Sequence, residues 1–318
     1  METENITASS AKLLSVSRSA MNGEFEVMFP RQRFSFGLEA AISALDEVER
    51  IERILSVFRF DSRVQYVNLT ANENAVQVDE EFFELLVQCR AVAEATGGAV
   101  DITSGRLWKL WGFAKRQGLV PSESEVAREL ETVGYKFLEL DVGRRTVRFL
   151  RGGMELNFGC VGKGFALDVA SVRLREFGVD RFIFHGGLSS ILACGEGWRI
   201  GAADPIRSGQ RLGEIVLSNN AVSTSSSQKQ FFRHKGHRYS HLIDPRTGFP
   251  AEGVFSVTVI APTATLAELL STAFFVMGIE RATDYQKKHP EIAAIFVLPT
   301  NKKTTSFEIK TIGQITHQ

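Results

Sequence analysis

The spacing of apolar residues predicts two helices in the first third of the chain. Between residues 39 and 58 apolar side chains recur at steps of three and four, while acids and arginines occupy the other face, which is typical of an amphipathic helix. A second helix is expected over about residues 80–96, because the pair Gly97-Gly98 would end it. The first helix should therefore bury one face and expose the other.

Alternating patterns predict strands further along. Segments 137–140 and 146–150 alternate apolar and polar residues around a polar turn at 142–145, which predicts a β-hairpin. Further strands are expected over 181–184, 215–217 and 255–260, and further helices over 165–177 and 264–277. Hairpins outnumber strand–helix–strand crossovers, so the expected fold class is α+β, with mostly antiparallel sheets flanked by helices. A doubly wound parallel sheet is the less favoured alternative.

Composition limits the class of function. The chain has 318 residues, of which 44% are hydrophobic, enough for a large core in one domain or two closely packed lobes. Lys and Arg total 37 and Asp and Glu total 37, so no overall basic field attracts nucleic acid. The three cysteines, Cys89, Cys160 and Cys194, lie far apart without CxxC spacing, which predicts reduced core thiols rather than a zinc site or disulfides.

The N-terminal residues are used to predict the domain boundary and the cellular location of the protein. Residues 1–19 are expected to be a flexible segment and residues 20–318 a single domain. The first twenty residues contain no apolar stretch of secretory length and no cysteine that could accept a lipid. No apolar run approaches the roughly 18–20 residues that span a bilayer. A soluble, cytoplasmic protein is therefore expected.

The segment RYSHLIDPRTGFP, residues 238–250, holds more reactive side chains than a turn requires. Gly248 can supply a positive φ and Asp244 can cap the turn with its own side chain. His241 and Arg246 are left without an obvious structural role. They are the first candidates for chemistry on an anionic substrate.

A glycine-rich segment, residues 159–164, precedes the helix expected at 165. Free N–H groups and the dipole at a helix N-terminus favour a phosphate, and Lys163 adds a positive charge. A plain strand-to-helix turn with a surface lysine is the alternative. The segment is not a P-loop, because Gly164 stands where that motif requires Ser or Thr, and Asn157 stands where it requires its first Gly.

Three polar groups remain open to two interpretations. Asp101 and Thr103 could hold a ribose, a base edge or a metal-bound water, although a turn made by their own side chains that caps the following helix is favoured. The run 223–227 is most simply a solvated loop, but its hydroxyl groups could bind phosphate. On the last helix one polar stripe faces water, a partner or a cation, and its oxygen-only donors would suit Mg²⁺. The stripe consists of Glu268, Ser271 and Thr272.

An ordered set of segments carries a resemblance to a known family. The segments are FRFDSRVQYVN (58–68), GGAVDIT (97–103), LNFGCVGKGFALD (156–168), FHGGLSS (184–190), STSSSQ (223–228), YSHLIDPRTGFP (239–250) and SVTVIAPTATLAELLSTAFFVMG (256–278). Together they resemble the ApbE family, the FAD:protein FMN transferases, over about residues 20–300. The SHxIDPxTGxP motif is highly specific to that family.

The resemblance implies a fold and an activity. Members are α+β proteins of T-fold-like architecture that bind FAD and Mg²⁺. They transfer the FMN moiety to a Thr or Ser hydroxyl in a motif of an acceptor protein and release AMP. Two alternatives stay open: a pyrophosphatase that converts FAD to FMN and AMP, and a non-catalytic relative that only binds FAD.

The resemblance also implies site residues. His241 matches a histidine implicated in catalysis, and Lys163 is expected to act beside the metal and the phosphates. The metal ligands would be the carbonyl of Gly162 and the side chains of Glu268, Ser271 and Thr272. The FAD-contacting positions would be Met21, Phe58, Ala99, Val100, Asp101, Gly159, Lys163, Phe165 and Leu242.

Three positions depart from the family pattern. Glu268 replaces the usual metal-ligand Asp, and its extra methylene moves the carboxylate outward by about 1.5 Å unless the helix adjusts. Asn157 and Leu188 stand where the family usually has aspartates.

Overall fold

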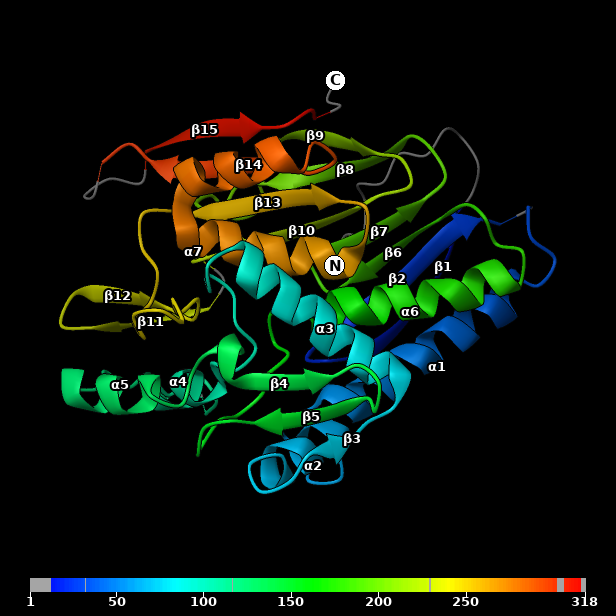
Figure 1. Ribbon diagram of the computed structural model, residues 1–318. Coiled ribbons are helices and arrows are strands. Elements are labelled where there is room, and N and C mark those ends of the chain that lie inside the picture. Colours follow the sequence, from blue (N-terminus) through cyan, green and yellow to red (C-terminus); the bar gives the residue numbers. More distant parts are fainter. Residues whose placement is uncertain (1–12, 32, 116, 229, 302–305, 316–318) are drawn as a thin grey trace.

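An eight-stranded antiparallel sheet forms the centre of the molecule (Figure 1). The computed structural model describes residues 13–315 except residues 32, 116, 229 and 302–305. In spatial order the strands are β1 (Leu13–Ala20), β2 (Gly23–Pro30), β6 (Phe182–Gly186), β7 (Ser190–Cys194), β10 (Ala221–Ser226), β13 (Ser256–Ala261), β14 (Ala293–Pro299) and β15 (Phe307–Ile312). Every neighbouring pair is antiparallel, which confirms the expected α+β class.

Three helices lie against one face of this sheet (Figure 1): α1 (Gly37–Leu55), α6 (Gly162–Glu176) and α7 (Ala264–Lys288). α1 packs on β1 and α6, α6 packs on α7, and α7 packs on β10 and β13. Helical spacing explains the packing of α1, because Ala44, Val48 and Ile51 share one face and are all buried. The helix α3 (Glu80–Ala95) also contacts α7.

A hairpin of β8 (Trp198–Ala203) and β9 (Arg211–Leu217) covers the other face of the sheet. Its Trp198 is fully buried in a second apolar cluster that includes Ile183 and Val222 of the sheet. Side chains of a strand alternate between faces, so Phe184 and Ala221 pack in the main core instead. The sheet is thus buried on both faces.

Smaller elements surround this framework (Figure 1). One group consists of the three-stranded sheet β3 (Val76–Gln77), β5 (Thr146–Phe149) and β4 (Leu138–Asp141), the short helices α2 (Arg63–Thr70), α4 (Gly105–Leu110) and α5 (Glu123–Leu130), and the 3₁₀ turn η1 (Tyr135–Phe137). The hairpin predicted over 137–150 is confirmed as β4 and β5. A separate hairpin, β11 (Phe231–His234) and β12 (His237–Ser240), leads into the polar turn.

Two expectations for the N-terminal region need correction. The first helix ends at Leu55 rather than residue 58, and Phe58 lies in the following turn with 66% of its surface exposed. Residues 13–19, expected to be flexible, belong to β1, where alternate residues such as Leu14 and Val16 pack against the core. The rest of the expected flexible segment, residues 1–12, lies outside the described residues.

Three further expectations change nearer the candidate site. α6 begins at Gly162, so Lys163 and Gly164 are part of the helix and not of a loop before it. The run expected as a solvated loop is mostly strand β10, with Ser223, Ser225 and Ser226 buried. α7 continues to Lys288, past a break at Gly278, where φ is 78°.

Two negative findings apply to the described residues. None of their helices is both long and apolar enough to cross a membrane. Their three cysteines form no disulfide, although Cys160 is half-buried and so not a full core residue.

Candidate functional site

The N-termini of α6 and α7 meet at an unusually close approach. A Cβ built on Gly164 would lie 2.3 Å from the backbone oxygen of Ala264, so only glycine fits there. Asp168 of α6 fixes the contact by accepting hydrogen bonds from the backbone N–H groups of Ala264 (2.9 Å) and Thr265 (2.8 Å) and from the Thr265 hydroxyl (2.6 Å). Asp168 therefore caps α7 from a neighbouring helix.

Glu268 lies beside this contact and is 5% exposed. Its Oε2 accepts from the backbone N–H of Gly164 at 2.8 Å, and its Oε1 accepts from the Ser190 hydroxyl at 2.7 Å. The ammonium of Lys163 lies 3.4 Å from Oε1 and also donates to the Ser189 hydroxyl. Three elements, α6, β7 and α7, therefore converge on one buried carboxylate.

Hydroxyl groups continue the cluster along α7 and β10. The Ser271 Oγ lies 2.9 Å from Ser225 Oγ and 3.5 Å from Ser223 Oγ, and it donates to the Glu268 carbonyl at 3.0 Å. The Thr272 hydroxyl lies 3.3 Å from Ser225 Oγ. We call Glu268, Ser190, Ser223, Ser225, Ser271 and Thr272 the carboxylate–hydroxyl cluster.

The donor chemistry of this cluster fits a hard divalent cation. It offers one carboxylate and several hydroxyl oxygens, the ligand type that Mg²⁺ prefers over nitrogen or sulfur. Within the described residues no group of three or more His, Cys, Asp or Glu side chains gathers, so a zinc-type site is not formed there. With a single carboxylate, the other ligand oxygens would come from the hydroxyl groups, a backbone carbonyl, water or a substrate.

The half-buried Cys160, just before α6, has a thiol of low reactivity. Burial, and then the negative charge of Glu268, raise its pKa to about 12. Burial likewise raises the pKa of the Cys89 thiol well above its ordinary value. Nucleophilic chemistry requires the thiolate, so these cysteines are unsuited to it near neutral pH.

The polar turn is a rigid scaffold. Asp244 accepts from the guanidinium of Arg246 through both carboxylate oxygens, at 2.8 and 2.7 Å, and this pairing raises the pKa of Arg246. Gly248 has a φ of 78°, and a Cβ there would lie 2.5 Å from Val126. Trp111 donates its indole N–H to the Gly248 carbonyl at 2.8 Å. Arg246 is thus a structural side chain, and His241 is the remaining candidate for chemistry in the turn.

One contact fixes the tautomer of His241. Its Nδ1 lies 3.0 Å from the backbone carbonyl of Gln230, and a carbonyl can only accept. Nδ1 therefore carries the proton in the neutral ring, and the basic lone pair is on Nε2. The ring also meets Phe113 edge-on at 6.4 Å. This arrangement suits a general base.

Asp101 is occupied by internal hydrogen bonds. It is buried and accepts from the backbone N–H and hydroxyl of Thr103, at 2.8 and 2.7 Å, and from the Tyr135 N–H at 2.7 Å. Burial raises its pKa, and the bonds from Thr103 and Tyr135 oppose that shift. The expected turn is confirmed, but neither side chain caps the following helix, because the N-cap of α4 is Ser104. Asp101 can contribute to a nucleotide site mainly by shaping this backbone.

The other expected FAD positions divide into two groups. Ala99, Val100, Phe165 and Leu242 are buried in the main core, where they can form only the floor of a site. Met21, Phe58 and Gly159 are at least partly exposed, and Met21 borders a hollow of about 420 Å³ with Glu52.

Close contacts at two glycines place several of these segments next to the site. A Cβ on Gly98 would lie 3.6 Å from Arg246, so the Ala99–Asp101 segment adjoins the polar turn. A Cβ on Gly23 would lie 3.4 Å from Gly187, shortly before Ser189, which binds Lys163, and Ser190, which binds Glu268. Phe58 instead packs against Trp108, with ring centroids 6.4 Å apart.

The structure shows the contacts or exposure of the three residues that depart from the family pattern. Asn157 accepts the N–H of Gly159 at 2.8 Å, so it shapes the turn before α6. Leu188 is 95% exposed in the turn between β6 and β7. Glu268 uses its longer side chain to reach both Gly164 and Ser190.

The sequence did not single out Asp168 or Ser190 as site residues. Asp168 is a single acid in the middle of α6, and its partners lie 96 and 97 positions away. Ser190 follows the Gly186-Gly187 break, and its partner is 78 positions away. Only the contact between elements identifies these roles.

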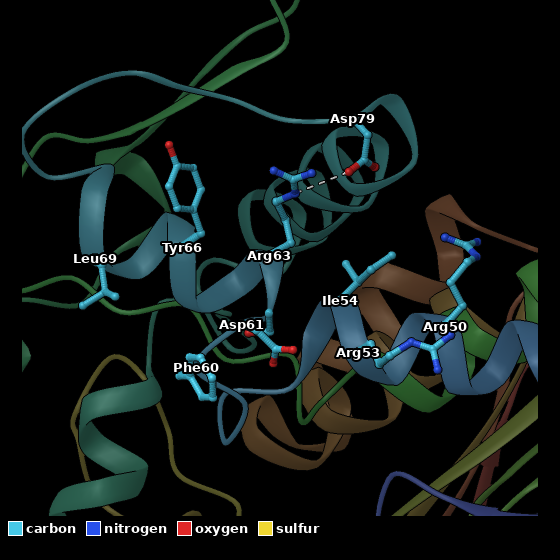
Figure 2. Close-up of a pocket in the computed structure, with 10 residues that line it drawn as sticks. Arg50, Arg53, Ile54, Phe60, Asp61, Arg63, Tyr66, Leu69 and Asp79 are labelled. Carbon is cyan, nitrogen blue, oxygen red and sulfur yellow. Dashed lines mark ion pairs between the residues drawn. The ribbon is translucent and has the colours of Figure 1, made fainter.

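A separate groove of about 610 Å³ lies between the ends of α1, α2 and α3 (Figure 2). Figure 2 shows Arg63 directed at Asp79, with N and O 3.6 Å apart, while Arg53 and Tyr66 extend from neighbouring helices. Its lining includes none of the expected site residues, so it is a feature apart from the carboxylate–hydroxyl cluster.

Comparison with solved structures defines the class of protein as ApbE-like. The ApbE protein of Thermotoga maritima matches with a TM-score of 0.84 and 30% identity, covering 95% of this chain and 97% of that chain. The flavin transferase ApbE of Vibrio cholerae also matches with a TM-score of 0.84, over 95% of this chain and 97% of its own. At 24% identity it supports the fold alone.

Sequence comparison then identifies the family. The chain belongs to the ApbE family, which it matches over residues 21–296. The FAD:protein FMN transferase of Treponema pallidum is 31% identical over 287 residues, which covers 83% of this chain and 79% of that protein. The corresponding Klebsiella pneumoniae protein is 29% identical over 252 residues, 79% of each chain.

Proposed function

We propose that this protein is an FAD:protein FMN transferase. It moves the FMN moiety of FAD to a Thr or Ser hydroxyl of an acceptor protein and releases AMP. The observation that carries the proposal is the buried Glu268, held by Gly164 and Ser190 and set beside Lys163. Membership of the ApbE family and the names of the relatives support the same activity.

The carboxylate–hydroxyl cluster would hold Mg²⁺ through Glu268, Ser271 and Thr272, with the carbonyl of Gly162. When bound, Mg²⁺ would neutralise charge on the diphosphate of FAD. Lys163, whose side chain is partly exposed, would bind the same phosphates from α6. The N–H groups of Gly162 and Gly164 are already bonded to Phe158 and Glu268, so the lysine side chain carries more of this task than those two amides.

His241 would accept the proton of the acceptor hydroxyl at Nε2. The hydroxyl oxygen forms a bond to the FMN phosphorus while the bond from that phosphorus to the AMP oxygen breaks, and AMP leaves with the electron pair. The bond from Nδ1 to Gln230 fixes the ring and its tautomer, so the lone pair that would accept the proton is on Nε2. Asp244 and Arg246 hold the turn that carries His241.

FAD would contact Met21, Phe58 and Gly159 and the floor formed by Ala99, Val100, Phe165 and Leu242. This division follows from their exposure, since the floor residues are buried and the others reach the surface. Asp101 would support the floor through Thr103 and Tyr135.

One assay tests the proposal. The protein is incubated with FAD, Mg²⁺ and a candidate acceptor protein with an exposed threonine, and covalent flavin is read as fluorescence on a denaturing gel. Matched reactions contain EDTA, or an acceptor whose threonine is replaced by valine. We expect flavin on the threonine acceptor alone, with AMP released in equal amount. Free FMN plus AMP would indicate a hydrolase instead, and unchanged FAD with every divalent metal would exclude both activities.

A further inference from the structure

Positive charge is concentrated in the segment that leads to His241. The whole chain has equal numbers of acidic and basic residues, yet no Asp or Glu occurs between Glu214 and Asp244. That stretch contains four Lys or Arg residues and three of the six histidines. Arg233, Lys235 and Arg238 belong to the hairpin β11–β12, whose position Figure 1 shows. The hairpin is therefore a local basic patch on a neutral protein.

One face of the hairpin is fixed by aromatic packing. Phe232 stacks on Tyr239 with centroids 5.2 Å apart, and these rings pack on Phe113 at 5.4 Å and Trp111 at 5.3 Å. Strand side chains alternate, so the opposite face carries Phe231, Arg233 and Arg238. We call those three residues the arginine face. It is not covered by this aromatic packing, and Arg233 and Phe231 are exposed.

The arginine face holds two like charges together. Arg233 and Arg238 are direct cross-strand partners, an arrangement that destabilises a hairpin. Burial, and then the charge of Arg233, lower the pKa of Arg238. Within the described residues neither arginine forms an ion pair, and the buried Nε of Arg238 has no hydrogen-bond partner. An anion bound between the two guanidinium groups would relieve the repulsion between them.

The arginine face adjoins the candidate site. Arg238 donates to the Ser227 carbonyl and the Gln228 side chain, which directly follow the strand that carries Ser223 and Ser225. On its other side, β12 ends at Ser240, one residue before His241. A polypeptide bound on this face would thus lie next to the proposed base.

We propose that the arginine face binds an acidic segment of the acceptor protein, next to the hydroxyl that receives FMN. This inference rests on the proposed function, in which a polypeptide hydroxyl must reach His241. Planar guanidinium groups match carboxylates in a two-point hydrogen-bonded geometry. Phe231, 40% exposed beneath the Arg238 guanidinium at 4.0 Å, adds an apolar contact that suits a polypeptide.

Direct binding of two labelled peptides tests the inference without requiring catalysis. Both are fluorescein-labelled and carry a central threonine, flanked by aspartates in one and by asparagines in the other. Fluorescence anisotropy gives each affinity at low and high salt. The main variant is Arg233→Gln, because that side chain is exposed. The matched control is Arg148→Gln, an exposed strand arginine of β5.

The wild type should bind the aspartate peptide about three- to tenfold more tightly than the asparagine peptide, and salt should remove the difference. Arg233→Gln should lose most of that preference and Arg148→Gln should keep it. Arg233→Glu should instead prefer a lysine-flanked peptide. The thermal midpoint of each variant confirms folding.

Equal affinity of the wild type for the two peptides would overturn the inference, as would Arg233→Gln behaving like Arg148→Gln. Two competitors of the labelled aspartate peptide are compared: inorganic phosphate and the same peptide without label. If phosphate competes equally well, the face binds phosphate, and the inference is overturned. Failure of the proposed function is distinguishable, because the peptide preference would then persist while no flavin is transferred to any acceptor.

Discussion

Glu268 is the residue on which the proposed chemistry depends most. Its two carboxylate oxygens accept from different elements, the Gly164 N–H of α6 and the Ser190 hydroxyl of β7. The extra methylene relative to Asp is thus used to span the gap between those elements. The carboxylate links the helix that carries Lys163 to the helix that carries Ser271.

Replacing Glu268 by Gln should damage both activity and stability. The amide can still accept from the Gly164 N–H and donate to the Ser190 hydroxyl, but it loses the charge that strengthens these bonds and pairs with Lys163, at a cost of about 1–3 kcal/mol in the free energy of unfolding. Transfer should fall at least about 100-fold because the metal loses its charged ligand. Activity against metal concentration and the thermal midpoint are measured together. Glu268→Asp, which keeps the charge, is the control and should retain more activity than Gln; equal loss in the two variants would contradict a ligand role.

His241→Ala should lose transfer while still binding FAD. Removal of a general base costs about 10²- to 10⁴-fold in rate. Single-turnover flavin transfer gives the rate, and quenching of flavin fluorescence gives FAD affinity. A variant that transfers at the wild-type rate would exclude the proton-acceptor role, and His241→Gln tests whether hydrogen bonding alone is sufficient.

His185 should make the protein acid-sensitive. Burial lowers its pKa to about 4, below the ordinary 6.5, and its buried Nε2 has no hydrogen-bond partner among the described residues. The unfolded chain therefore binds the proton more readily, and stability should fall as the pH decreases from about 6.5 towards 4. Chemical denaturation at pH 7 and pH 4 should show a loss about 3 kcal/mol larger in the wild type than in His185→Leu. If the stability of the two proteins falls equally between pH 7 and pH 4, His185 is not responsible. Burial raises the pKa of Asp101 and of Asp168, so these groups stabilise the fold as the pH falls, equally in both proteins.

At the scale of elements, the site depends on how closely α6 approaches α7. Gly164 allows the backbones to touch, and Asp168 bonds across the contact to the first residues of α7. This approach sets the position of Glu268 relative to Lys163. The β11–β12 hairpin contributes separately, because its Gln230 carbonyl orients His241.

Gly164→Ala should separate the two helices. The added Cβ would meet the Ala264 oxygen at 2.3 Å, which is backbone and cannot rotate away. We expect a loss of about 2–3 kcal/mol in the free energy of unfolding and weaker metal-dependent activity. Gly162→Ala is the stability control, because its Cβ would meet only Leu55 at an ordinary 3.7 Å. Equal denaturation midpoints for the two variants would show that the close approach is not required.

At the scale of the whole molecule, one sheet supports two cores. The helical layer carries the candidate site, while the β8–β9 hairpin closes the opposite face around Trp198. Site residues come from α6, β7, β10, the polar turn and α7, so a ligand that contacts all of them joins distant parts of the chain. Binding should therefore stabilise the whole fold.

FAD and Mg²⁺ together should raise the thermal midpoint by more than the sum of their separate effects. A ligand at 100 times its Kd adds about 2.7 kcal/mol, or about 5 °C for a protein of this size. Because coupling is reciprocal, Mg²⁺ should also tighten FAD binding, and EDTA should reverse that gain. Differential scanning fluorimetry with each ligand alone and both together measures this. If EDTA does not change the thermal midpoint measured with FAD and Mg²⁺ together, the two ligands do not share a site.

The sequence by itself determined the fold class and located much of the candidate site. Local periodicity specified α1, α3 and the β4–β5 hairpin, and the family motifs pointed to His241, Lys163 and Glu268. Those features depend on neighbours within a few positions, which is why a sequence pattern records them.

Only the tertiary structure decided which side chains meet. The segment 223–226, expected as a loop, is part of a strand whose serines are buried. The structure also shows the hydrogen-bond partners of Asp168, Ser190 and Gln230. It also placed Arg233 against Arg238. The contacts of Asp168 and Ser190 depend on packing between segments distant in the chain. Those of Gln230 and Arg233 depend on the register of one hairpin, which residue spacing alone does not specify.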